Sequence, residues 1–73
     1  MLCVDATERF AQNPRRQRTR AKLSQEALGF LCGLHRTEIS LLERAGREPR
    51  LGTIVKLARA LKIPPTRLLD GIR

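Results

Sequence analysis

Two short helical patterns separated by Gly33 constrain what this chain can fold into more than any other feature. Ser24 can cap the first helix, which is predicted over about residues 24–32. The apolar face of this helix is predicted to consist of Ala27, Leu28, Leu31 and Cys32. Gly33 can adopt the left-handed conformation that ends a helix without steric cost. The pattern therefore predicts a tight turn followed by a second helix over about residues 35–44.

The second helix is predicted to have one narrow buried edge and one edge rich in hydrogen-bonding groups. Ile39 and Leu42 are three positions apart and form the buried edge. The positions that can form hydrogen bonds are His35, Arg36, Thr37, Glu38 and Ser40. A short helix with these two edges is suited to lie in a groove of a nucleic acid.

The charge of the chain favours a polyanionic partner. Its 15 Lys and Arg residues and 7 Asp and Glu residues give a net charge of +8, which suits DNA, RNA or an anionic membrane surface. Phe10 and Phe30 are the only aromatic residues, and this scarcity argues against the base-stacking surfaces of single-strand binders. Because no apolar run approaches a membrane span or a signal sequence, we expect a cytoplasmic protein with no membrane partner.

The sequence gives almost no support for catalysis or for a bound metal. Cys3 and Cys32 lack metal-ligand spacing, and free thiols in a reducing cytosol are the expected state. His35 is the single histidine, and the acidic residues are scattered among stronger positive charge. We therefore expect a protein that is not an enzyme and that binds no metal, cofactor or small molecule.

The 73 residues are predicted to form one all-α domain, a compact bundle of about five short helices. In the favoured interpretation, the first helix runs over about 6–21 and bends at Pro14; in the alternative, it begins at residue 14. A fourth helix is predicted from Thr53 by the apolar spacing of Ile54, Leu57, Ala58 and Leu61. A short last helix is predicted over about 65–71.

An ordered set of motifs over about residues 10–72 resembles the lambda-repressor-like helix-turn-helix regulators, also called the xenobiotic-response-element family. Within that family, Phe30 and Leu31 before Cys32-Gly33 resemble the controller proteins of restriction–modification systems, which are single-domain dimers. Ala45 departs from the family pattern, which has a helix-ending glycine there, and Gly46 follows one residue later. The matching motifs are Leu23-Ser24-Gln25-Glu26, Gly33, Ile39-Ser40, Glu43-Arg44, Pro49, Lys56-Leu57-Ala58 and Ala60-Leu61.

The resemblance implies roles for individual residues on duplex DNA. It makes the helix over 35–44 the recognition helix, and it pairs Arg18 with Glu43. Leu41 falls at a base-facing position that is often polar in the family. The assigned base contacts are Arg36, Thr37, Ser40 and Leu41. The resemblance assigns phosphate contacts to Arg18 and Gln25. The residues themselves predict further phosphate contacts at a helix start and in the loop after the recognition helix, namely Ser24, His35, Arg47 and Arg50.

These observations predict a sequence-specific, double-stranded DNA-binding transcriptional regulator that acts as a homodimer on a pseudo-palindromic operator. The alternatives are an antitoxin-type regulator of a toxin–antitoxin operon, or a basic RNA-binding or protein-interaction module. Dimerisation is predicted to use residues 54–73, and the same apolar residues could instead close the core against Phe10 and Phe30. The predicted interface residues are Val55, Ile63, Leu69 and Ile72.

Overall fold

The computed structural model describes residues 5–72, so Cys3 lies outside the described residues. These residues form four α-helices and one short 3₁₀ helix: α1 (Ala6–Arg20), α2 (Gln25–Cys32), α3 (Arg36–Glu43), α4 (Leu51–Leu61) and η1 (Pro65–Leu69). The prediction of about five helices was wrong by one, because the last segment is only a 3₁₀ helix. It is a five-residue stretch that follows Pro64, and such short stretches favour i→i+3 hydrogen bonds.

Helix α1 is continuous and contains Pro14, as the favoured sequence interpretation had it. Asp5 caps it by accepting a hydrogen bond from the Thr7 backbone N–H over 3.2 Å. Pro14 has no N–H to donate within the helix, and it is buried against the rest of the molecule. The adjacent buried Asn13 donates from Nδ2 to the Leu68 and Asp70 carbonyls, both over 2.9 Å. These bonds attach α1 to the C-terminal segment.

All four α-helices end in the same hydrogen-bonding pattern, in which a residue beyond the helix donates its N–H back five positions. The residue before that donor is in the left-handed region in every case. Ala45 has this conformation, with φ of 59° at the end of α3, so Gly46 does not take over the role of the family's glycine. The four left-handed residues are Lys22, Gly33, Ala45 and Lys62.

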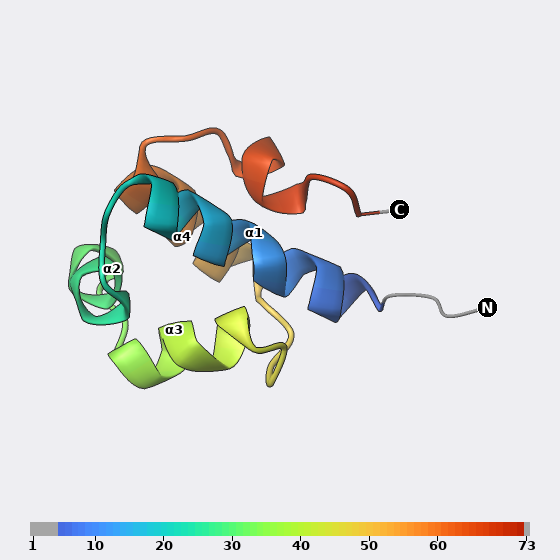
Figure 1. Ribbon diagram of the computed structural model, residues 1–73, viewed down its shortest axis with the longest axis horizontal. Coiled ribbons are helices and arrows are strands. Elements are labelled where there is room, and N and C mark those ends of the chain that lie inside the picture. The colour runs from blue at the N-terminus through green and yellow to red at the C-terminus, as the bar shows by residue number, and fades with distance from the viewer. Residues whose placement is uncertain (1–4, 73) are drawn as a thin grey trace.

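The core lies between the four α-helices: α2 packs against both α3 and α4, α1 packs across α3 and α4, and η1 closes one side against α1 and α4 (Figure 1). Helix α2 lies so close to the turn before α3 that a Cβ atom on Gly29 would be only 2.6 Å from the Leu34 carbonyl oxygen. This position therefore requires glycine. The central side chains are Phe10, Leu28, Ile39, Leu42, Leu57 and Leu68.

The assignment of Leu31 to the buried face of α2 was wrong, and Phe30 is not available to close the core. Leu31 is 55% exposed and Phe30 is 86% exposed. Helix α2 buries the face that contains Leu28 and Gly29, with Cys32 packed at its edge. Since nearly every residue from 27 to 32 is apolar, a single buried face leaves Phe30 and Leu31 in solvent.

Candidate nucleic-acid interface

Helix α3 has an inner edge that is anchored in the core and an outer edge that carries polar side chains. Ile39 and Leu42 are buried on the inner edge. Arg36 and Thr37 are exposed on the outer edge, and Ser40 and Leu41 are half-buried. Arg36, Thr37 and Ser40 line a shallow hollow together with Gln25 of α2. The structure therefore brings the assigned base-contacting residues onto one helix, beside the start of α2.

The N-termini of α2 and α3 are both capped by side chains from the assigned phosphate contacts. Ser24 Oγ accepts from the Ala27 backbone N–H over 2.9 Å and begins α2. His35 Nδ1 accepts from the Thr37 backbone N–H over 3.1 Å and begins α3. Each cap satisfies one of the backbone donors that a helix start leaves unpaired. Ser24 and His35 are also exposed, so capping leaves them accessible to a ligand.

Arg18 and Glu43 join α1 to the end of α3 in a bidentate ion pair. The Nε–Oε2 distance is 2.7 Å and the Nη2–Oε1 distance is 3.0 Å. Their side chains are 16% and 4% exposed, respectively. The hydrogen bond to Glu43 raises the pKa of the Arg18 guanidinium above its ordinary value, although partial burial opposes the shift.

The remaining hydrogen bonds around this ion pair favour a structural role for it. Arg18 Nη1 donates to the Leu23 carbonyl over 2.8 Å, so all three guanidinium nitrogens of Arg18 have partners within the chain. Gln25 Nε2 donates to Glu43 Oε1 over 3.2 Å. Of the assigned phosphate contacts, Arg18 and Gln25 therefore already belong to an internal network that fixes α1, α2 and α3 together.

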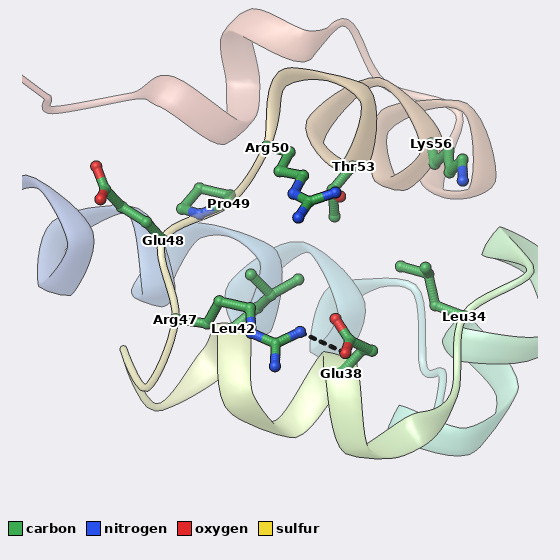
Figure 2. Close-up of a pocket in the computed structure, with 9 residues that line it drawn as sticks. All are labelled: Leu34, Glu38, Leu42, Arg47, Glu48, Pro49, Arg50, Thr53 and Lys56. Carbon is green, nitrogen blue, oxygen red and sulfur yellow. Dashed lines mark hydrogen bonds and ion pairs between the residues drawn. The ribbon is translucent and has the colours of Figure 1, made fainter.

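A cleft of about 710 Å³ separates α3 from the start of α4 and is closed at one end by the loop between them (Figure 2). The Arg47 side chain extends from the loop along the α3 side of the cleft, with its Nη1 2.5 Å from Glu38 Oε1 (Figure 2). Arg50 points into the cleft from the start of α4, and Lys56 stands further along that helix (Figure 2). The cleft therefore gathers three cations beside α3, of which Arg47 already has a partner.

Two features of this surface were missed by sequence reasoning. Lys56 was not among the assigned DNA contacts, and its place in the cleft depends on where α4 lies relative to α3. The contact between the His35 and Thr37 side chains was also missed. The position of His35 just before α3 could have indicated it, because side chains at that position often cap a helix.

The four residues predicted to form a dimer interface differ in exposure. Ile63 and Ile72 are half-buried and pack against the core of the same chain. Val55 is also half-buried, whereas Leu69 is 43% exposed. Leu69 is therefore the member of this set with the most surface left for a partner.

The remaining chemistry of residues 5–72 is limited. They contain no cluster of three or more His, Cys, Asp or Glu side chains that could hold a metal ion. Cys32 is a half-buried free thiol, and desolvation raises its pKa against the opposing charge of Lys56. No helix in this part of the chain has the length and apolar character needed to cross a membrane.

The capped α2, the Gly33 turn and the solvent-facing polar edge of α3 define a helix-turn-helix domain. The helix-turn-helix family model matches residues 15–68, and the chain belongs to this family in its lambda-repressor-like form. The family resemblance seen in the sequence is thereby confirmed.

Several relatives are controller proteins. The chain is 45% identical to control protein C.BamHI of Bacillus amyloliquefaciens, over 84% of this chain and 76% of that protein. It is 42% identical to control protein C.SmaI of Serratia marcescens, over 90% and 79% of the two chains. The crystal structure of the restriction–modification controller protein C.AhdI from Aeromonas hydrophila superposes with a TM-score of 0.83 at 45% identity, covering 85% and 94% of the two chains.

A further relative was crystallised on DNA. The P22 c2 repressor, in complex with a synthetic operator, superposes with a TM-score of 0.77 at 34% identity. The match covers 85% of this chain and 94% of the repressor chain. The fold described here is therefore similar to one that has been observed on operator DNA.

Proposed function

We propose that this chain is a sequence-specific transcriptional regulator that binds double-stranded DNA as a homodimer. The observation that carries the proposal is the exposed edge of α3, where Arg36 and Thr37 face solvent on a helix anchored by Ile39 and Leu42. The likeness to a repressor crystallised with operator DNA supports it, as does the net charge of +8. In this role the protein is a binding protein of the cytoplasm rather than an enzyme.

In the proposed complex, α3 lies in the major groove and reads base edges. The Arg36 guanidinium can donate two hydrogen bonds to guanine O6 and N7, a pairing worth about 1–3 kcal/mol of discrimination. Ser40 and Leu41 follow one turn later on the same helix. Ser24, His35 and Arg50 contact phosphates and hold the register, because such contacts position a protein without reading sequence. Arg47 also contacts a phosphate once its ion pair with Glu38 is broken.

We further propose that the regulator is of the restriction–modification controller type. The support is the set of control proteins among its relatives, two of them 45% and 42% identical to it. Its mechanism is occupancy: the bound dimer blocks or recruits RNA polymerase at a promoter, with no need for an effector pocket.

Selection of duplexes from a random-sequence pool tests the proposed function. We expect enrichment of a pseudo-palindrome whose half-sites lie one helical turn apart, about 34–36 Å, as two-fold symmetry requires. Failure to enrich any sequence would contradict the proposal. Tighter binding to RNA than to duplex DNA of equal length would also contradict it, and would favour an RNA-binding module.

Leu69→Glu is expected to weaken the dimer, because a carboxylate would replace an exposed apolar side chain in the proposed interface. Sedimentation at micromolar concentration should show a folded monomer, and operator binding should fall with it. Leu31→Glu is the matched control, since it makes the same change at an exposed leucine on α2, outside the proposed interface. A Leu69→Glu variant that stays dimeric would place the two-fold axis elsewhere.

A further inference from the structure

We propose that Thr37 acts as a hydrogen-bond acceptor that selects an amino-bearing base, adenine or cytosine, because His35 holds its hydroxyl proton. The inference rests on the proposed function and names the base chemistry that this position of the recognition helix would accept. His35 is then a positioning residue, since it acts on DNA sequence through Thr37.

The hydrogen bonds at the start of α3 determine which His35 nitrogen carries a proton. The backbone N–H of Thr37 donates to His35 Nδ1 over 3.1 Å, so Nδ1 must present its lone pair. The imidazole is therefore the neutral tautomer with its proton on Nε2. This leaves an Nε2–H donor on an exposed side chain, which suits the phosphate contact proposed for His35.

The same nitrogen fixes the direction of the Thr37 hydroxyl. Oγ1 of Thr37 lies 2.8 Å from His35 Nδ1. Since Nδ1 has no proton to give, the hydroxyl donates its own to the Nδ1 lone pair, which it shares with the Thr37 backbone N–H. Thr37 is the second residue of α3, so the helix has no carbonyl four residues earlier that could compete for this proton.

A hydroxyl whose proton is already used can only accept hydrogen bonds from other partners. In the major groove the base donors are the N4 amino group of cytosine and the N6 amino group of adenine. Guanine and thymine present the acceptors O6, N7 and O4 instead. Thr37 is exposed on the same edge as Arg36, so its oxygen would meet a favourable partner only at an amino-bearing base.

Two Thr37 variants test this assignment. Their affinities are measured for the selected duplex and for duplexes in which one base pair at a time is reversed. For the wild-type protein we expect one position per half-site where the orientation that presents the amino group binds roughly 3- to 10-fold more tightly, as for one neutral hydrogen bond. Thr37→Val should lose this preference, because it keeps the shape without the hydroxyl. Thr37→Ser should keep it, because it retains the hydroxyl.

Several outcomes would overturn the inference. A preference kept by Thr37→Val and lost by Thr37→Ser would show that Thr37 reads a thymine methyl group. A preference for a keto base, or no position that responds to Thr37→Val, would also overturn it while leaving the proposed function intact. A wild-type protein without sequence preference at any position would instead defeat the proposed function itself.

Variants of His35 test its positioning role. His35→Asn keeps a side-chain acceptor at the cap and should retain the amino preference. His35→Gly keeps a residue that caps well but removes the acceptor, so the preference should fall below roughly 2-fold as the hydroxyl becomes free to rotate. Equal preferences in the Asn and Gly variants would remove His35 from the mechanism.

The tautomer can be measured without DNA. Long-range ¹H–¹⁵N correlation spectra of the free protein at pH 8 should show the His35 proton on Nε2. A proton on Nδ1 would overturn the inference whatever the outcome of the binding experiments.

Discussion

Glu43→Ala is expected to lower the melting temperature of the protein by about 12–24 °C. Removing one member of a buried ion pair leaves the other charge without its partner, at a cost of about 3–5 kcal/mol. We expect the lower value, about 3 kcal/mol, because Arg18 is partly exposed. In a domain of this size each kcal/mol shifts the melting temperature by about 4–8 °C. Thermal unfolding followed by circular dichroism measures the shift.

Glu38→Ala is the matched control, because it removes the acidic partner from the other ion pair on α3. The side chains of Arg47 and Glu38 are 52% and 37% exposed, and exposed pairs of this kind contribute less than about 1 kcal/mol. Its melting temperature should therefore change little. If Glu43→Ala left melting unchanged but weakened DNA binding, the Arg18–Glu43 pair would belong to the interface rather than to the fold.

The affinity for DNA is expected to fall about 10³-fold between 50 and 200 mM salt. A dimer that neutralises five or six phosphates should give a slope of log K against log salt of roughly −5, at about −0.9 per phosphate. The cations around α3 can supply these contacts from two subunits, mainly through Arg47, Arg50 and Lys56. Fluorescence anisotropy titrations of a labelled duplex over this salt range measure the slope.

Two arginine variants show whether the cleft is the source of this salt dependence. Arg50→Ala should make the slope less steep by about 2 for the dimer, one phosphate per subunit. Arg67→Ala should leave it unchanged, because Arg67 is exposed on η1 and does not line the cleft. A wild-type slope near −1 would show that the basic surface faces away from DNA.

Much of the fold could be predicted where the sequence carries a single strong signal. Gly33 has the left-handed conformation expected of it, with φ of 73°. Ile39 and Leu42 are the buried edge of α3, as predicted. This prediction was unambiguous because no other apolar pair in that segment has helical spacing. Arg18 lies against Glu43, a pairing implied by the family resemblance, which carries tertiary information that periodicity lacks.

The sequence was less informative where several signals were compatible with different structures. Residues 27–32 are so uniformly apolar that periodicity could not show which face of α2 is buried, and Phe30 proved exposed. Helix α4 begins at Leu51 rather than Thr53, because Gly52 is tolerated within its first turn. Ala45 ends α3 in a conformation usually left to glycine. The cleft and the contact between His35 and Thr37 depend on packing and side-chain direction, which no residue pattern specified.

The central claim is that the exposed edge of α3 reads the sequence of duplex DNA, and Arg36→Ala tests it most directly. The affinities of the wild-type and variant proteins are measured at one salt concentration, for the selected duplex and for a shuffled duplex of equal composition. We expect the wild-type protein to prefer the selected duplex by about 10³-fold or more. Arg36→Ala should lose roughly 10-fold or more of that preference, with little change on the shuffled duplex. Equal losses on both duplexes would reduce Arg36 to a phosphate contact and contradict the account.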